Sequence, residues 1–330
     1  MPQPHAPTPA HASFPRLLGD IGGTNARFAW QSGPGTAPAQ IDSYRCADHG
    51  SLQDAMGHYL SAHGLAAPRW CAIGIANPVV GDLVRMTNHD WQFSIEALRV
   101  QFGMARFLVI NDFTALALAL PALRPEDVRQ VGQGTAVARS PLGLIGPGTG
   151  LGVSGLLPAD GGRSAIPING EGGHVTLAGT TPLEDAVIAR LRERFGHASA
   201  ERAVSGPGLV NLHTALCELD GAAAEALDAA AISARAQAGD ARAGQAVELF
   251  FAFLGTVAGN LVLSLGARGG MYIGGGIVPR LGDRIDASAF RERFEAKGRF
   301  RDYLRGIPTF VVQASTSPAL LGAARALEDL

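Results

Sequence analysis

The chain has 330 residues, of which 47% are hydrophobic, and its 27 basic and 29 acidic residues give a net charge of −2. This length is sufficient for two domains with hydrophobic cores. The balanced charge excludes the strongly cationic surface that binding to nucleic acid or an anionic membrane requires, so we expect small polar partners. The three cysteines, Cys46, Cys71 and Cys217, have no CxxC spacing, which predicts reduced thiols in a cytosolic protein and neither a zinc site nor disulfides.

Three further features of the sequence limit the classes of protein to which the chain can belong. Residues 1–14 lack the basic and apolar segments of a secretory signal, and we expect a disordered tail. Residues 250–267 are uncharged and long enough to cross a membrane, but glycines and polar residues dilute the stretch, which favours a buried core helix. The only lysine, Lys297, lies in no glycine-rich loop. A Walker A loop, a protein-kinase strand lysine and a pyridoxal-phosphate Schiff base are therefore excluded, and any phosphate must be held by backbone N–H groups and a metal.

The first half of the chain alternates apolar strands with helices. The pattern predicts strands at 16–19 and 25–30 around a tight turn, a helix near 51–63, a strand at 70–75, a loop-rich stretch at 76–91, a helix at 94–102 capped by Ser94, a strand at 106–112 and a helix at 113–121 that Pro121 ends.

The second half repeats the opening layout. Residues 142–157 again read as an apolar strand, a glycine-rich turn and a returning strand, and Gly-Thr pairs occur at 23–24 and 148–149. This favours internal duplication at the scale of a domain. Further on, the sequence predicts a helix from Pro182 to about Phe195 with a Thr181/Glu184 capping box, a third glycine cluster within 271–281 between a strand and a helix, and a last helix with Ser317 as its N-cap.

The glycine turns are the first candidate binding sites. Backbone N–H groups can converge on a phosphate only where no Cβ obstructs them and where φ can become positive, and threonine hydroxyls add donors. One such turn is equally compatible with an ordinary hairpin, but two matching turns and a third cluster favour phosphate binding. The residues concerned are Gly22, Gly23, Thr24, Gly148, Thr149, Gly150 and Gly274 to Gly276.

Two aspartates follow apolar strands. Asp20 lies beside the first glycine turn, where a bridging Mg²⁺ would remove its repulsion of a phosphate; the alternative is that it only caps the turn. Asp112 ends the strand at 106–112, where open α/β sheets place their ligands, so its carboxylate could deprotonate a substrate hydroxyl. The alternative is that Asn111 or Asp112 caps the next helix.

Weaker candidates occur in two loops. Glu171 and His174 lie three residues apart around a pair of glycines, and Glu201 lies between two helices. A loop carboxylate and a histidine are commonly uninvolved in function, so these residues alone would not define a site.

Taken together, the motifs resemble those of bacterial glucokinases, sugar kinases that share an ATPase core with actin. The resemblance runs from about residue 16 to the C-terminus. It rests on LLGDIGGTNAR, MTNHDW, INDFTALALALP, GPGTGLGVSGLL, GEGGHV, ERAVSGPGLVNL, YIGGGIVPRL and the stretch from FEAKGRF to LLGAA. Related families with a similar GEGGH segment carry a cysteine-rich zinc motif, whereas this chain has no cysteine between Cys71 and Cys217, so the match is to the zinc-free branch and His174 is expected to bind sugar.

The resemblance implies a role for each matched residue. It implies that ATP contacts Gly19, Asp20, Ile21, Gly22, Gly23, Thr24, Gly148, Thr149 and Gly150, with Gly274, Gly275 and Gly276 near its base and ribose. It implies that Asp112 is the catalytic base, that Asp20 holds Mg²⁺ through water, and that glucose hydroxyls contact Asn111, Asp112, Glu171, His174 and Glu201.

The implied fold class is α/β, the two-lobed actin-like ATPase (ribonuclease H-like) fold with its active site in the interdomain cleft. We expect a small domain of residues 15–111 plus about 312–330 and a large domain of 112–311, in a cytoplasmic homodimer. The implied function is ATP-dependent phosphorylation of D-glucose to glucose 6-phosphate. The alternatives are a kinase for fructose, mannose or an N-acetylhexosamine, a polyphosphate-using kinase, and a non-catalytic regulator that binds sugar and ATP.

Overall fold

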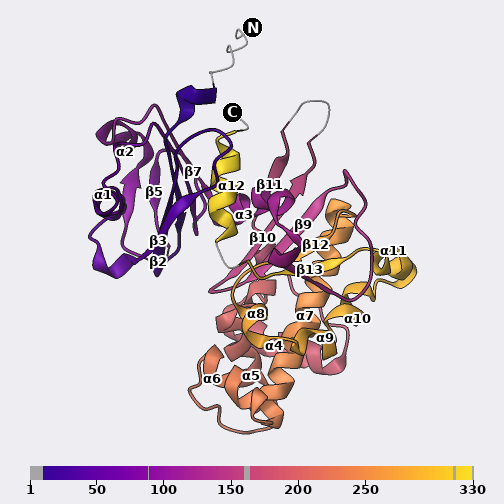
Figure 1. Ribbon diagram of the computed structural model, residues 1–330. Helices are drawn as coiled ribbons and strands as arrows, with labels where there is room; N and C mark the ends of the chain where they lie inside the picture. The colour runs from indigo at the N-terminus through magenta and orange to yellow at the C-terminus, as the bar shows by residue number, and fades with distance from the viewer. Residues whose placement is uncertain (1–9, 88, 160–163, 315–316, 329–330) are drawn as a thin grey trace. The chain divides into compact units, whose positions relative to one another are not determined.

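The chain divides into two compact units in the computed structural model, which describes residues 10–87, 89–159, 164–314 and 317–328 (Figure 1). Unit 1 comprises Met1–Leu123 and Ser315–Leu330, and unit 2 comprises Arg124–Ala314. The expected boundary between the small and the large domain was at 111/112. In the structure the chain passes from unit 1 to unit 2 after residue 123, because the helix α3 (Asp112–Ala119) packs on the C-terminal helix α12 (Pro318–Ala326) within unit 1.

Unit 1 contains one main sheet, a small two-stranded sheet and four α-helices within its described residues. Its elements in chain order are η1 (Ala10–Ser13), β1 (Arg16–Ile21), β2 (Asn25–Gln31), β3 (Ala39–Arg45), η2 (Cys46–Asp48), α1 (Leu52–Ala62), β4 (Trp70–Ile75), β5 (Leu83–Arg85), β6 (Gln92–Ser94), α2 (Ile95–Gln101), β7 (Arg106–Asn111), α3, η3 (Leu120–Ala122) and α12.

The main sheet of unit 1 has the strand order β3-β2-β1-β4-β7. The hairpins β1–β2 and β2–β3 are antiparallel, whereas β4 and β7 run parallel to β1. One face packs on α1 and α2 around Phe28, Tyr59 and Ile73, and the other face packs on α12 around Leu18 and Leu320. Because β1, β4 and β7 are parallel, their carboxyl ends lie along one edge of the sheet.

Unit 2 contains a larger sheet and most of the helices. Its elements are η4 (Pro125–Asp127), β8 (Val128–Val131), β9 (Leu142–Pro147), β10 (Leu151–Leu157), β11 (Ile166–Gly170), η5 (Gly172–His174), α4 (Pro182–Phe195), η6 (Ala200–Arg202), α5 (Gly206–Leu219), α6 (Ala229–Gln237), α7 (Ala241–Leu265), β12 (Met271–Ile273), α8 (Ile277–Leu281), α9 (Arg284–Ala287), α10 (Phe290–Glu295), η7 (Gly298–Phe300), α11 (Arg301–Arg305) and β13 (Thr309–Val312).

The sheet of unit 2 repeats the topology of unit 1. Its order is β11-β10-β9-β12-β13-β8, in which β9, β10 and β11 are joined antiparallel, β12 and β13 run parallel to β9, and β8 adds an antiparallel edge. The first five strands therefore match β3-β2-β1-β4-β7 in order and direction. The two Gly-Thr turns occupy equivalent places: one connects β1 to β2 and the other connects β9 to β10. The topology confirms the duplication that the sequence predicted.

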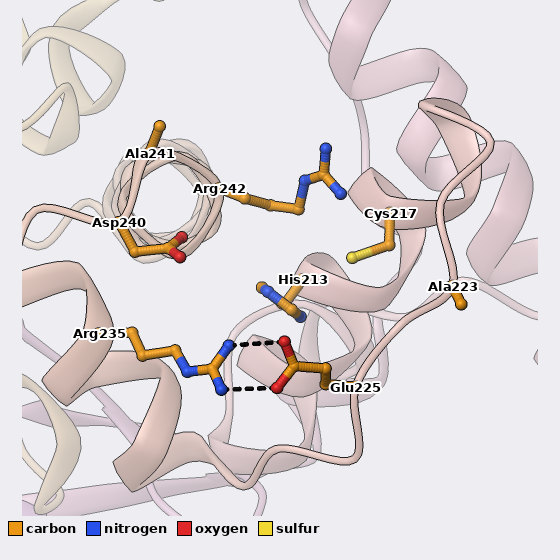
Figure 2. Close-up of a pocket in the computed structure, with 8 residues that line it drawn as sticks. All are labelled: His213, Cys217, Ala223, Glu225, Arg235, Asp240, Ala241 and Arg242. Carbon is orange, nitrogen blue, oxygen red and sulfur yellow. Dashed lines mark hydrogen bonds and ion pairs between the residues drawn. The ribbon is translucent and has the colours of Figure 1, made fainter.

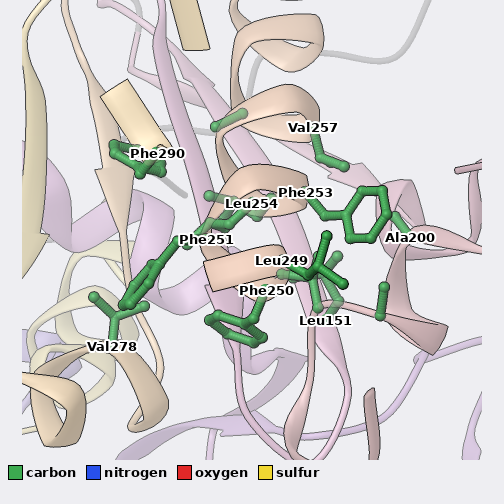
Figure 3. Close-up of a cluster of buried hydrophobic side chains, with 14 of the residues drawn as sticks. Leu151, Ala200, Leu249, Phe250, Phe251, Phe253, Leu254, Val257, Val278 and Phe290 are labelled. Carbon is green, nitrogen blue, oxygen red and sulfur yellow. The ribbon is translucent and has the colours of Figure 1, made fainter. Parts of the chain in front are cut away.

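The long apolar helix α7 lies in the core of unit 2 (Figure 3). By length and composition it could cross a membrane, but most of it is buried against the rest of the unit. Two of its glycines lie where α10 approaches closely: a Cβ at Gly255 would overlap the Phe290 carbonyl oxygen, and one at Gly259 would lie 2.5 Å from the Phe294 carbonyl oxygen. These glycines therefore serve helix packing, and the expectation of a core helix is confirmed.

Several local predictions need correction. The stretch 76–91 contains β5, which pairs with β6. Residues 10–13 of the expected tail form a 3-10 helix, whereas 1–9 lie outside the described residues. Ser317 precedes α12 but makes no capping hydrogen bond. Thr181 does cap α4, but Glu184 accepts from the Thr180 N–H instead of completing a capping box.

Candidate functional site

Asp112 follows the partly buried strand β7 at the start of α3. Its neighbour Asn111 is the N-cap, since the Asn111 side-chain oxygen accepts hydrogen bonds from the N–H groups of Phe113 and Thr114. The Asp112 carboxylate accepts a hydrogen bond from the Phe113 N–H at 2.9 Å, and the Asn111 side chain is a further partner. Burial, and secondly the charge of Asp20, raise the pKa of Asp112 to about 6. A carboxylate with this pKa is poised to accept a proton near neutral pH.

Asp20 lies in β1, on the strand that precedes the first glycine turn, and its carboxylate is fixed by two partners. Its Oδ2 accepts hydrogen bonds from the Arg27 guanidinium at 3.2 Å and from the Ser317 hydroxyl at 2.6 Å. The side chain is 16% exposed. Among the described residues, the hydrogen-bond partners of Asp20 come from β2 and from the residue before α12, and not from the turn that the alternative reading required. Sequence reasoning missed both partners. Ser317 lies 297 positions away in the chain, and Arg27 faces Asp20 only because β1 pairs with β2 in the register that places them opposite each other.

The first glycine turn connects β1 to β2. The Gly22 N–H closes the turn on the Asn25 carbonyl, and the Thr24 carbonyl accepts from the Cys46 N–H, each at 2.9 Å. Among the described residues, the N–H groups of Gly23 and Thr24 have no such partner. Gly19 and Ile21 serve the core: a Cβ at Gly19 would overlap Ile73, and the Ile21 side chain is buried, which leaves only backbone for a ligand.

The second glycine turn connects β9 to β10 and contacts the start of α5. The Gly148 N–H donates to the Gly150 carbonyl, and the Gly148 carbonyl accepts from the Gly206 N–H, both at 2.8 Å. Gly206 is the first residue of α5, so the partial positive charge of a helix N-terminus lies beside the turn. The exposed Thr149 forms its tip.

The sequence attributed these glycines partly to positive φ, and the structure corrects this. Gly22, Gly148 and Gly150 all lie outside the left-handed region. A Cβ at Gly150 would lie 2.5 Å from the Glu201 carboxylate, whereas a Cβ at Gly148 would meet no atom of the described chain within 4 Å. Nothing in the fold itself therefore requires glycine at 148.

Glu201 connects the second turn to His174. Its Oε2 accepts from the Leu151 N–H at 2.8 Å, and its Oε1 lies 4.0 Å from His174 Nε2. The structure thus brings together two residues that the sequence singled out separately. Glu171 is exposed at the start of the same short helix η5, and its backbone carbonyl accepts from the His174 N–H.

The third glycine cluster follows β12 and precedes α8, as predicted. The Gly274 N–H donates to the Ile145 carbonyl at 2.8 Å, which ties the cluster to β9. Gly275 has a φ of +76°, and a Cβ there would also overlap the Pro147 carbonyl oxygen. Here positive φ is required. Gly275 and Gly276 are exposed.

One further polar residue at the edge of the unit 1 sheet was missed by sequence reasoning. Asn77 follows β4, and its backbone carbonyl accepts from the Asn111 side chain at 3.5 Å. Its own side-chain oxygen accepts from the N–H and hydroxyl of Thr87, in the MTNHDW segment. A polar residue two positions after the end of a buried strand was the available signal. Asn88 of that segment lies outside the described residues.

The candidate residues therefore form one group in each unit. In unit 1, Asp20, Asn111 and Asp112 lie at the carboxyl edge of the parallel strands, with the first glycine turn beside them. In unit 2, the second turn, Glu201 and His174 form a connected group, and the third cluster is tied to β9. The described residues contain no cluster of three or more His, Cys, Asp or Glu side chains that could enclose a metal ion.

Comparison with known proteins covers both units. The model of the glucokinase family matches residues 17–330. A glucokinase from Aromatoleum aromaticum is 56% identical over 325 residues, which cover 98% of this chain and 97% of that protein. The bifunctional protein glk of Burkholderia pseudomallei is 51% identical over 97% of this chain, which spans only 49% of that protein.

Among solved structures, a glucokinase from an Antarctic psychrotroph superimposes with a TM-score of 0.86 and 36% identity, over 96% of this chain and 99% of that one. Together with the two mixed α/β units, this match confirms the fold class that the sequence predicted.

Proposed function

Because the chain belongs to the glucokinase family, we propose that it transfers the γ-phosphoryl group of ATP to the 6-hydroxyl of D-glucose and releases glucose 6-phosphate and ADP. We place this reaction in the cytoplasm, as the first step of glycolysis, and in a homodimer, as the family resemblance implies. The observation that carries the mechanism is Asp112, a carboxylate at a strand end whose pKa is raised to about 6.

Asp112 acts as the general base. The hydrogen bond that it accepts from the Phe113 N–H fixes the carboxylate, which accepts the proton of the sugar hydroxyl. In phosphoryl transfer the proton leaves late, since the transition state is loose and catalysis depends mainly on positioning and charge neutralisation. Asn111 keeps Asp112 at the strand end by capping α3, and its side-chain amide contacts the sugar.

The phosphates of ATP are held by backbone groups. Gly19 to Thr24 in unit 1 and Gly148 to Gly150 in unit 2 supply them, and the N–H groups of Gly23 and Thr24 are not used within the described chain. The open space at Gly148 supports this role, because a glycine that the fold does not require is explained by close approach of a ligand. Gly274 to Gly276 lie near the adenosine.

Asp20 is suited to hold Mg²⁺ through water. Mg²⁺ retains most of its waters and takes one or two carboxylates with phosphate oxygens, which fits a single carboxylate better than a closed protein cage. Arg27 and Ser317 engage one oxygen of Asp20, so the other remains for a water ligand. Bound Mg²⁺ would neutralise phosphate charge. Asp20 would orient the water molecules that surround the ion.

Glucose selectivity comes from Asn111, Asp112, Glu171, His174 and Glu201, whose polar groups pair with sugar hydroxyls. Glu201 and His174 are already close to each other, and the Glu201 carboxylate is fixed by the Leu151 N–H. A pocket of this kind rejects other hexoses because a misplaced hydroxyl leaves a polar group without a partner.

The test is kinetic. Asp112→Asn is expected to lower kcat on the order of 10²-fold or more with glucose binding largely retained, as for loss of a general base. Glu171→Gln and His174→Ala should instead raise KM for glucose. Coupled assays that compare kcat/KM for glucose, fructose, mannose and N-acetylhexosamines identify the hexose that is the substrate. Near-normal kcat in Asp112→Asn would remove Asp112 from this role, and a higher kcat/KM for another hexose would replace glucose as the substrate.

A further inference from the structure

The three cysteines are all buried, but their thiols have different surroundings. Cys217 lines a pocket of about 320 Å³ in unit 2, in which the Arg235 guanidinium already forms an ion pair with Glu225 (Figure 2). The Cys71 thiol, in β4, makes no hydrogen bond within the described residues. Cys46 follows β3 and begins η2, and in the part of the chain that the structure describes its thiol alone contacts a glycine turn. Cys46 therefore touches a candidate binding site, although no step of the proposed reaction uses it.

Cys46 holds the first glycine turn by two of its carbonyl groups. The Cys46 thiol donates to the Gly22 carbonyl at 3.4 Å, and the Cys46 N–H donates to the Thr24 carbonyl at 2.9 Å. The register of β3 brings the residue to this place, because Arg45 lies opposite Asn25, the residue that follows the turn. Cys46 is fully buried and packs in the core of unit 1. A single core residue therefore fastens the turn at both of its ends.

The thiol contact also sets the direction of a backbone donor. The Gly22 carbonyl and the Gly23 N–H belong to one trans peptide group, in which they point in opposite directions. Because the carbonyl faces the Cys46 thiol in the core, the Gly23 N–H faces away from the core. On that side Gly23 is half-buried and Thr24 is exposed. Neither the Gly23 N–H nor the Thr24 N–H donates to another described residue, so the outward donors are unused by the fold.

The thiol is protonated at neutral pH, because burial raises the pKa of Cys46 above its ordinary value. A protonated thiol donates to the Gly22 carbonyl, whereas a thiolate would repel the carbonyl oxygen. An S–H group is a weak donor, so its loss should change the orientation of one peptide group and not the fold of unit 1. That peptide group turns easily, because the two backbone angles beside it belong to Gly22 and Gly23, which lack a Cβ.

From these contacts we propose that Cys46 is a positioning residue for the phosphates of ATP, which acts through the first glycine turn and does not touch the nucleotide. The proposal rests on the proposed function, in which backbone N–H groups of this turn hold the phosphates. The thiol directs the Gly23 N–H outward before ATP binds, so less conformational freedom is lost on binding. Without the thiol, the Gly22–Gly23 peptide group rotates between orientations and presents its donor for only part of the time.

The experiment combines steady-state kinetics of the full chain with calorimetric titration by AMPPNP, a non-hydrolysable ATP analogue, in the presence of MgCl₂. Cys46→Ala should raise both KM for ATP and the Kd of AMPPNP about three- to fivefold, as for loss of one weak hydrogen bond, while kcat and KM for glucose stay unchanged. Cys46→Ser keeps a donor and should restore most of the affinity. Cys71→Ala is the matched control, because Cys71 is fully buried in the same core and its thiol makes no hydrogen bond within the described residues; it should leave KM for ATP unchanged.

Three results would overturn the proposal. These are an unchanged Kd of AMPPNP in Cys46→Ala, an equal effect of Cys71→Ala, and equal affinities of the alanine and serine variants at position 46. Circular dichroism establishes that each variant is folded, and if Cys46→Ala does not fold, Cys46→Val removes the donor with less loss of volume. Calorimetry separates this proposal from the proposed function. If the unmodified chain binds AMPPNP but does not phosphorylate glucose, the proposed function fails, while the Kd values still decide the role of Cys46.

Discussion

The ionised Asp112 carboxylate is expected to lower the free energy of unfolding of unit 1 at neutral pH. Replacing Asp112 by asparagine should therefore stabilise the fold and, at the same time, remove activity. Burial and the charge of Asp20 raise the pKa of Asp112 from its ordinary value of 3.8 to about 6 in the folded chain. Between these two values the folded chain binds more protons than the unfolded chain. Stability from the protonated carboxyl is therefore fully present below about pH 3.8 and is lost as the pH rises through about 6.

The magnitude follows from the difference between the two pKa values. From 3.8 to about 6, at about 1.4 kcal/mol for each pH unit, the ionised carboxylate costs folding up to about 3 kcal/mol. Asparagine is neutral and of the same shape, and its side-chain oxygen can still accept the Phe113 N–H. Asp112→Asn should therefore raise the free energy of unfolding of unit 1 by about 1–3 kcal/mol near pH 8 and by little near pH 4.

Tryptophan fluorescence isolates the relevant transition, because all three tryptophans, Trp30, Trp70 and Trp91, belong to unit 1. Urea titrations at the two pH values, with and without Asp112→Asn, give the change in stability. Asp48→Asn, an exposed aspartate of the same unit, is the matched control and should change neither curve. If Asp112→Asn is no more stable than the natural sequence near pH 8, or gains as much near pH 4, the carboxylate is not destabilised by its surroundings.

Three further predictions address other parts of the molecule. Gly148→Ala should raise KM for ATP several-fold and leave the urea midpoint unchanged, since the added methyl meets no described atom within 4 Å; Gly244→Ala, equally open, should leave KM unchanged. Ser317→Ala should raise the half-saturating Mg²⁺ concentration about tenfold in rate assays, as for loss of a partner that orients a ligand. Arg293→Met should destabilise unit 2 by about 3 kcal/mol, measured by circular dichroism in urea, because Glu184 is 2% exposed and loses its ion pair.

Much of this fold could be read from local sequence, because its strands are short, apolar and bounded by glycine or polar residues. The strand at 70–75 has the predicted limits, and the helices that begin after Ser94 and Asn111 have the expected side-chain caps. The two Gly-Thr turns revealed the duplication because equivalent hairpins require equivalent turns. The acidic end of β7 was predicted by the rule that parallel sheets place polar ligand groups at their carboxyl edge.

The features that the sequence did not predict depend on contacts between segments that are distant in the chain. Ser317 was expected to cap α12, but its hydroxyl donates to Asp20, because α12 packs on the face of the unit 1 sheet that includes β1. Only the tertiary fold decides between the two partners. The glycines were likewise explained too simply. Sequence reasoning offered positive φ as one reason for each turn, whereas Gly150 makes room for Glu201 and only Gly275 needs positive φ within its cluster.

The two duplicated sheets have different residue types at equivalent positions beside their glycine turns. We therefore expect the two turns to bind the phosphates of ATP in different ways. When Gly23 is matched to Gly148, Asp20 corresponds to Ile145, which is fully buried. The strand that leads into the second turn therefore carries no carboxylate at this position. The Glu201 carboxylate lies beside Gly150 but accepts from the Leu151 N–H, and the N-terminus of α5 lies beside the turn as a source of positive potential. The first turn has a carboxylate and no such helix, so it needs a cation. We therefore expect only the first turn to depend on Mg²⁺. Asp20→Asn should change the magnesium dependence of the rate, whereas Gly148→Ala should change KM for ATP at every magnesium concentration.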